Sequence, residues 1–210
     1  CQSKVAYEPL TLVDGVYELP NDEDWSTDRN ILGTIVVPDG KTLTISSNAT
    51  IRFADSEQLA TRTRLIVKPG GRLITSDNAT LTAIESCPNS MWDGIQLHGD
   101  EDLPQGTGDT DLDQAYMFSK NTTIKNARVG VLVANDFRVS QLLGKINNLR
   151  SGGIIEAETS TFENNVYDVA FSPYENFEPG DPTDILPNRS HFHLCAFKTT
   201  GPLADPEVYP

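Results

Sequence analysis

Short runs of alternating apolar and polar residues dominate the first hundred positions of the chain. Runs at 31–37, 42–45, 50–53, 65–67, 72–75 and 80–83 are rich in β-branched residues, and Gly, Pro, Asn, Asp or Ser bounds each of them. Alternation with a period of two predicts strands with one buried face, and the bounding residues predict tight turns. No long window has the 3.6-residue period of an amphipathic helix. The pattern therefore predicts an all-β protein.

One strand–turn–strand phrase occurs twice. Residues 37–51 (VPDGKTLTISSNATI) return as residues 68–81 (KPGGRLITSDNATL). Pro38 and Pro69 are 31 positions apart, whereas Asn48 and Asn78 are 30 apart, so the two copies are expected to differ by one turn residue. A repeated unit of this size cannot bury its apolar face alone and has to stack on its neighbour, which predicts a solenoid.

A second repeat follows in the other half of the chain. Residues 124–133 match residues 162–171 at a spacing of 38, and a partial third copy begins at Cys195. Asparagine recurs at the bends, where it tolerates left-handed backbone angles and can hydrogen-bond along a stack. Short strands repeated in phase predict a parallel β-helix with loops of varying length extruded from its turns. A β-sandwich would also have short alternating strands, but it would not explain the repeats.

The chain divides into two expected parts. Residues 1–30 are less regular and are expected to be an N-terminal cap or lead-in segment. Residues 31–210 are expected to form the β-helix domain, which would continue beyond the chain end. Within it, residues 98–114 are rich in Asp and Gly and have only Leu103 and Leu112 as apolar core candidates. They are expected to form a long acidic surface loop.

Charge and cysteine content narrow the range of partners. The formal net charge of −14 at pH 7 disfavours nucleic acid or an anionic membrane surface as the partner, because both repel an acidic protein. Cys1 is either the lipid-bearing residue of a processed bacterial lipoprotein or merely the residue at which the sequence starts. A lipid on Cys1 would be the only expected membrane attachment. Cys87 and Cys195 would remain as buried thiols or as a disulfide pair.

Several motifs of the chain form a recognisable set, at residues 25–33, 37–45, 65–73, 91–95, 152–157 and 199–203. This set resembles right-handed parallel β-helix regions in secreted and cell-surface proteins of the Bacteroidota, whose fold is pectate-lyase-like. The resemblance implies a right-handed, single-stranded parallel β-helix at the cell surface or outside the cell. It also implies export by the type IX secretion system as part of a longer chain.

Enzymes with this fold act on acidic polysaccharides and place carboxylates at equivalent outward positions of successive coils. Lyases hold Ca²⁺ in this way, and hydrolases use close pairs of Asp for acid and base catalysis. The outward positions expected here carry mainly Thr, Lys and Arg: Lys41, Thr44, Arg52, Lys68, Arg72, Thr75 and Thr82. The sequence therefore leans against an enzyme. A polysaccharide lyase or glycoside hydrolase built from loops 54–63, 98–114 and 172–187 is the alternative.

The best cation-site candidate is the alternating carboxylate run of Asp109, Asp111 and Asp113. Carboxylates at every second position can converge on Ca²⁺ where the backbone curls. No other cofactor is expected. His191 and His193 would share one face of a strand and are expected to be a surface pair rather than metal ligands.

Two tryptophans remain as candidates for glycan contact. Trp25 and Trp92 offer rings on which a sugar can stack, but Trp92 lies between apolar strands and is expected to be structural.

Together these features predict a non-enzymatic, extracellular β-helix module with a structural or adhesive role in a large surface protein. Its expected partners are a glycan or protein ligand, other domains of a longer chain, or the secretion machinery. A surface lipoprotein subunit of a secretion or gliding-motility assembly is the other alternative.

Overall fold

The computed structural model describes residues 5–10, 12–55, 62–84, 90–106, 113–135 and 150–201. These residues form twenty short strands joined by turns and loops, and none of them is helical. The described part accordingly contains no apolar helix long enough to cross a membrane. The all-β prediction is confirmed.

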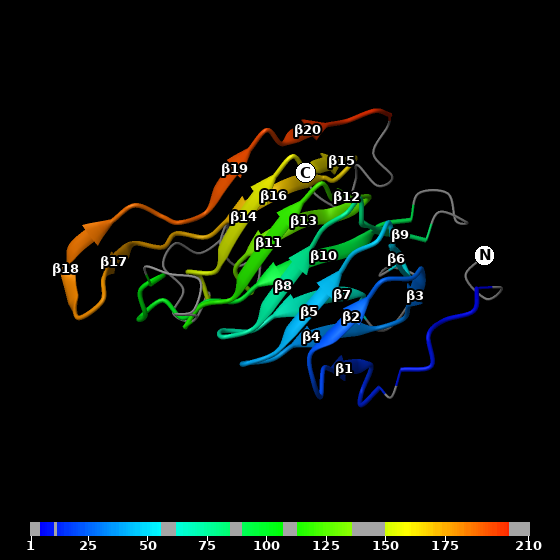
Figure 1. Cartoon of the computed structure of the whole chain (residues 1–210), viewed down its shortest axis with the longest axis horizontal. Coiled ribbons are helices and arrows are strands. Elements are labelled where there is room, and N and C mark those ends of the chain that lie inside the picture. Colours follow the sequence, from blue (N-terminus) through cyan, green and yellow to red (C-terminus); the bar gives the residue numbers. More distant parts are fainter. Residues whose placement is uncertain are drawn as a thin grey trace.

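Three six-stranded parallel sheets wind around one core (Figure 1). Sheet A contains β1 (Val16–Glu18), β4 (Thr34–Val37), β7 (Arg64–Val67), β10 (Trp92–Leu97), β13 (Ala127–Val133) and β16 (Tyr167–Phe171). Sheet B contains β2 (Glu23–Trp25), β5 (Thr42–Ile45), β8 (Arg72–Thr75), β11 (Tyr116–Lys120), β14 (Ile154–Glu158) and β19 (His191–His193). Sheet C contains β3 (Arg29–Ile31), β6 (Thr50–Phe53), β9 (Thr80–Ala83), β12 (Thr123–Lys125), β15 (Thr161–Glu163) and β20 (Ala196–Lys198).

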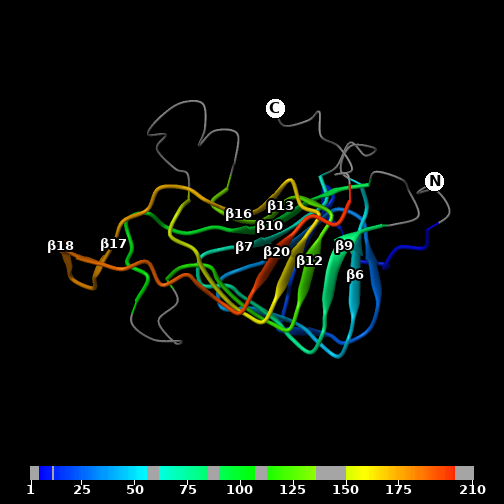
Figure 2. The ribbon, with the colours of Figure 1, turned by 90° about the horizontal axis from the view of Figure 1, so that it is seen from above.

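Successive triplets of strands form six coils, which we number coil 1 (β1–β3) to coil 6 (β16, β19 and β20). Every strand pairs in parallel with the equivalent strand of the next coil, and Figure 2 shows sheets A and C as two separate walls. This arrangement is the predicted right-handed, single-stranded parallel β-helix.

The register corrects the predicted turn lengths of the first repeat. Val37 pairs with Val67 and Thr42 with Arg72, so coils 2 and 3 differ by 30 residues on both sides of the turn. The structural partner of Gly40 is therefore Gly70, and both have positive φ angles, 67° and 77°. The prediction of one extra turn residue was wrong because it aligned identical letters, whereas the left-handed turn position determines which glycines are equivalent.

The 38-residue repeat is confirmed by strand pairing. Ile124 lies opposite Phe162, and Phe162 in turn lies opposite Phe197 in the partial third copy. The predicted role of asparagine is confirmed as well, because Asn48, Asn78, Asn121, Asn126 and Asn164 all have φ between 48° and 61°. Asn78 Nδ2 donates to Asn48 Oδ1 over 3.3 Å, one rung of a ladder along the stack.

Inward-facing apolar side chains form one continuous core along the stack. The rings of Phe53 and Trp92 stack with centroids 4.2 Å apart, and both side chains are fully buried. Burying such a side chain contributes about 1.5–3 kcal/mol. Gly94 makes a bulge possible in β10, because a Cβ there would lie 1.6 Å from the carbonyl oxygen of Val129.

One residue expected to face outward, Thr75, belongs to the interior and is 0% exposed. Thr82 keeps its outward position opposite Arg52, and Asn126, whose Nδ2 donates to Thr82 Oγ1 at 3.1 Å, covers it. Thr75 Oγ1 donates to Ser119 Oγ at 3.1 Å, and the Ser119 and Ser160 hydroxyls are 3.0 Å apart. Stacking supplies each hydroxyl with a partner from the next coil, so small polar residues can occupy inward positions.

The two ends of the stack differ. The segment expected to be a cap or lead-in, residues 1–30, contains most of coil 1 itself. Before coil 1, Glu8 N donates to Asn30 O at 2.9 Å, and Leu10 packs against the core. At the other end, β16, β19 and β20 are the last strands of their sheets. Continuation of the helix beyond residue 210 stays a prediction.

Candidate functional site

The three longest connections lie at one edge of the β-helix, where sheet A leads into sheet B. This connection is only four residues long in coils 2 and 3 (38–41 and 68–71), but it spans 98–115, 134–153 and 172–190 in coils 4, 5 and 6. The last contains an antiparallel hairpin of β17 (Asn176–Glu178) and β18 (Asp181–Leu186), which projects from the stack in both views (Figures 1 and 2).

The described part of the segment 98–114 contains no strand, and burial within it differs from the expectation. Leu103, the expected core residue, is 37% exposed, whereas the polar side chain of Gln105 is completely buried. Leu112 lies outside the described residues. A polar side chain can be buried between stacked loops when each of its polar atoms has a hydrogen-bond partner there. Hydrophobicity alone therefore does not predict which side chain of a loop is buried.

Gln105 ties the loops of coils 4, 5 and 6 together. Its backbone N–H donates to Asn176 Oδ1 at 2.8 Å, and its side-chain Nε2 donates to the carbonyl oxygen of Gly152 at 3.1 Å. Its Oε1 accepts from the backbone N–H of Arg189 at 2.8 Å, and Arg189 Nη1 donates back to Gln105 O at 2.9 Å. Asn176 Nδ2 in turn donates to Pro187 O at 2.9 Å. The base of the hairpin is thereby held against the other two loops.

A second buried glutamine shapes the start of the acidic loop. Gln114, 1% exposed, accepts from the backbone N–H of Asp100 and donates to the carbonyl oxygens of Asp100 and Leu103, each at 2.7 Å. Tyr174 from the coil 6 loop donates to the same Leu103 oxygen at 2.6 Å. Backbone groups that a loop would otherwise leave unpaired are satisfied here, so this loop is ordered by side chains.

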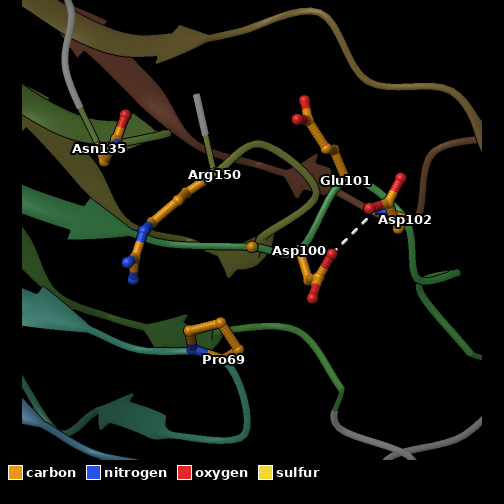
Figure 3. Close-up of a pocket in the computed structure, with 7 residues that line it drawn as sticks. Pro69, Asp100, Glu101, Asp102, Asn135 and Arg150 are labelled. Carbon is orange, nitrogen blue, oxygen red and sulfur yellow. Dashed lines mark hydrogen bonds between the residues drawn. The ribbon is translucent and has the colours of Figure 1, made fainter. Parts of the chain in front are cut away.

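The coil 3 turn and the connections of coils 4 and 5 border a cleft of about 700 Å³, lined by Pro69, Gly99, Asp100, Glu101, Asp102, Asn135 and Arg150. Figure 3 shows Arg150 and Asp100 on either side above Pro69, with Glu101 and Asp102 farther out. Asp102 N donates to Asp100 Oδ1 at 3.0 Å, which fixes the turn that carries the carboxylates. The cleft combines one guanidinium with three carboxylates.

His98 lies beside the cleft at the end of β10 and is only 9% exposed. Burial, followed by the positive charges of Arg150, Arg64 and Lys68, lowers the pKa of His98 to about 4. Its Nε2 is 3.1 Å from Gln96 Oε1. The ring is therefore neutral near pH 7. The positive charges of Arg150, Arg64 and Lys68 disfavour its protonation.

A buried ion pair lies on the side of sheet A that faces away from the core. Arg128 Nη1 donates to Asp93 Oδ1 at 2.7 Å, and both residues are less than a tenth exposed. Arg62, which precedes β7, contacts the other Asp93 oxygen at 3.5 Å. The carboxylate thus links three neighbouring coils and is already neutralised, so its role is structural.

The loops proposed for an enzyme site are only partly brought together. Loops 98–114 and 172–187 meet through Gln105 and Asn176, as described above. Loop 54–63 is different, because it leads into the start of β7, at the opposite end of the sheet A strands. Its residues 56–61 lie outside the described part.

The predicted metal and lipid sites fall mostly outside the described residues. Asp109 and Asp111 are not among them, and Asp113 is exposed. Within the described ranges, no group of three His, Cys, Asp or Glu residues is arranged to hold a metal ion. Cys1 and Cys87 also lie outside the described part, while Cys195 is a free, partly buried thiol.

Two further candidates are assigned by burial. His191 and His193 are exposed on one strand face, as predicted for a surface pair. Trp25 and Trp92 are at most 1% exposed. The prediction that Trp92 is structural is confirmed, and neither ring is available for stacking on a sugar.

The cleft can bind a polar ligand by charge and hydrogen bonding. Arg150 can pair with a carboxylate or phosphate, and Asp100, Glu101 and Asp102 can accept from hydroxyls or contact a hard cation. Gln105, Gln114 and Arg189, which hold the loops beside the cleft, were missed from the sequence. The length of the 98–114 segment is the one signal that pointed to this place.

Comparison with protein-family models, with curated proteins and with solved structures finds no match to this chain. The fold therefore rests on the geometry described above.

Proposed function

We propose that the chain is a non-enzymatic, extracellular β-helix module that serves as a stiff structural and adhesion element of a larger surface protein. The observation that carries the proposal is the convergence of three long loops on one edge, where buried hydrogen bonds of Gln105 and Gln114 hold them. A cleft whose walls are already ordered loses little conformational entropy when it binds a ligand. The three stacked parallel sheets that make up the rest of the described chain suit a rigid spacer.

The ligand class follows from the lining of the cleft. One guanidinium beside three carboxylates and an amide fits an acidic oligosaccharide, whose carboxylate would pair with Arg150 and whose hydroxyls would donate to Asp100 and its neighbours. Ca²⁺ would strengthen this contact by bridging protein and ligand carboxylates.

Titration calorimetry with oligogalacturonate and oligoalginate, with and without Ca²⁺, tests the proposal. Arg150→Ala should weaken binding by roughly tenfold or more, in keeping with the loss of one charge-assisted hydrogen bond. Arg52→Ala is the matched control. Arg52 lies in sheet C, so this substitution removes the same charge at a position away from the cleft. Failure of every acidic glycan to bind would reject the glycan-adhesion role.

The same mixtures of protein and glycan also test the enzymatic alternative, through the products that a lyase or hydrolase would release. Release of unsaturated or reducing ends from either polymer would show a lyase or hydrolase and would overturn the non-enzymatic assignment.

Export and anchoring form a separate part of the proposal, supported by the sequence motifs. Transport by the type IX system of the Bacteroidota places the protein at the outer-membrane surface or outside the cell. Mass spectrometry of the native N-terminus tests the lipoprotein alternative, which predicts a diacylated Cys1.

A further inference from the structure

Three cationic side chains of this acidic protein have no carboxylate partner in the part of the chain that the structure describes. They are Lys41, Arg72 and Arg150, whereas side chains such as Arg52 and Lys198 form ion pairs with Asp or Glu at 3.0 and 3.1 Å. The formal net charge of the chain is −14, so acidic groups are abundant and a cation without one is unexpected. Each of the three can therefore bind an anion from outside the chain.

All three cations lie at the edge where sheet A leads into sheet B. Lys41 is the last residue of the coil 2 turn, Arg72 is the first residue of β8 in coil 3, and Arg150 belongs to the coil 5 connection. The backbone N–H of Arg72 donates to the carbonyl oxygen of Lys41 at 2.9 Å, and β5 and β8 lie side by side (Figure 1). Neighbouring coils are about 5 Å apart along the stack. The cations thus follow the axis of the β-helix, at spacings of one coil and of two coils.

Arg72 lies over an aromatic ring that is itself held in place. Leu73 belongs to the core, so Arg72 projects from the outer face of sheet B, with its guanidinium carbon 5.8 Å from the centre of the Tyr116 ring. The Tyr116 hydroxyl donates to Glu156 Oε2 at 2.9 Å, and Arg189 Nη2 is 3.5 Å from the other oxygen of that carboxylate. The attraction between a cation and a ring is worth about 0.5–1 kcal/mol at an exposed site, and it occupies none of the guanidinium N–H groups. These donors remain available to a ligand.

This guanidinium is also close to the cleft. Pro69 lines the cleft and precedes Arg72 by only three residues, so their Cα atoms are at most about 11 Å apart. Gly70, between them, donates from its backbone N–H to the carbonyl oxygen of Gln114 at 3.3 Å, which holds the turn against the coil 4 connection. A chain molecule bound at Arg150 can reach Arg72 by crossing this turn.

We propose that an acidic oligosaccharide bound in the cleft continues along this edge toward coil 2, with one carboxylate on Arg72 and, in longer chains, another on Lys41. The inference rests on the glycan-binding function proposed above and adds to it a second anion subsite outside the cleft. It also fixes the direction of the bound glycan, along the stack of coils. A polyanion with a charge on every sugar unit fits this edge, because it presents carboxylates at regular intervals to cations that are themselves spaced by coils.

The dependence of binding on ligand length tests the subsite. Digalacturonate and hexagalacturonate are titrated, with Ca²⁺ present, into the isotope-labelled 210-residue chain and followed by amide chemical shifts. The wild type should bind the hexamer more tightly, and only the hexamer should shift the first residues of β5 and β8. Arg72→Gln should weaken hexamer binding about fivefold, as expected for one partly exposed charge contact, and leave dimer binding unchanged. Arg52→Gln in sheet C is the matched control and should change neither affinity.

The possible outcomes separate this subsite from the function on which it rests. If neither glycan binds the wild type, the cleft function fails and the subsite fails with it. If Arg150→Ala abolishes binding of digalacturonate but Arg72→Gln leaves hexamer binding unchanged, the cleft function stands and the subsite is overturned. An equal loss for both ligands in Arg72→Gln would also overturn it, because Arg72 would then act on the cleft itself.

Discussion

Acidification should destabilise the folded protein through His98. Burial and the nearby positive charges of Arg150, Arg64 and Lys68 lower the pKa of this side chain from 6.5 to about 4. At pH 5 the folded protein therefore keeps the ring neutral, whereas the unfolded chain, with the ordinary pKa, binds a proton. Stability rises with pH, and so is lost on acidification, wherever the unfolded state binds more protons than the folded state.

The size of the effect follows from the two pKa values. For one group that titrates at 6.5 when unfolded and at about 4 when folded, the linkage relation gives a loss of about 2 kcal/mol between pH 7 and pH 5. The stabilisation is fully present above pH 6.5 and is lost as the pH falls toward 4. Below about 4 the loss levels off, because both states are then protonated.

Urea unfolding of the wild type and of His98→Gln at pH 7 and pH 5 measures this contribution. The buried Trp25 and Trp92 provide the fluorescence signal. Glutamine does not titrate, and carboxylates common to both proteins cancel in the difference. The wild type should lose about 2 kcal/mol more than the variant over this range. Equal losses in the two proteins would refute the assignment of His98 as a buried neutral ring.

Three further predictions concern stability and local order. Leu194 has a φ of 53° and is 75% exposed, so Leu194→Asn should stabilise by about 1 kcal/mol in urea unfolding, and a loss would contradict the strain argument. Arg128→Met leaves the Asp93 carboxylate buried without this partner and should lower the free energy of unfolding by about 3 kcal/mol. Lys120→Met breaks the exposed pair with Glu158 and should lower it by less than about 1 kcal/mol. Similar losses in the two variants would reject the distinction between a buried and an exposed ion pair. Gln105→Ala should speed amide exchange in the β17–β18 hairpin while leaving sheet C protected, and unchanged exchange would show that the hairpin is held by other contacts.

The sequence predicted the architecture because the determinants of a coil are local. Strands of three to seven residues with period-two alternation, bounded by Gly and Asn, repeat whenever the chain completes a coil. The asparagine bends were recognisable because few residues tolerate a left-handed backbone. The same local reading aligned Pro38 with Pro69, which would make Gly71 the partner of Gly40. Identical residue letters do not reveal that Gly70 has the positive φ of Gly40.

The candidate site could be predicted only as a place. Length and acidity marked the 98–114 segment as a loop, but the residues that order it are glutamines and an arginine that resemble ordinary surface residues. Gln105 is buried because Asn176 and Arg189, more than 70 positions away, supply its hydrogen-bond partners. Such partners become neighbours only after the coils have stacked.

The sequence by itself thus determined the all-β content, the stacked coil and the position of its bends, because propensity and turn chemistry act over a few residues. Tertiary structure alone decided which polar side chains are buried, as for Thr75, Gln105 and Asp93. It also decided that the loops of coils 4 to 6 meet at Gln105. The physical reason is that burial, pairing of charges and a shifted pKa such as that of His98 depend on groups from different coils, whose proximity is created by stacking.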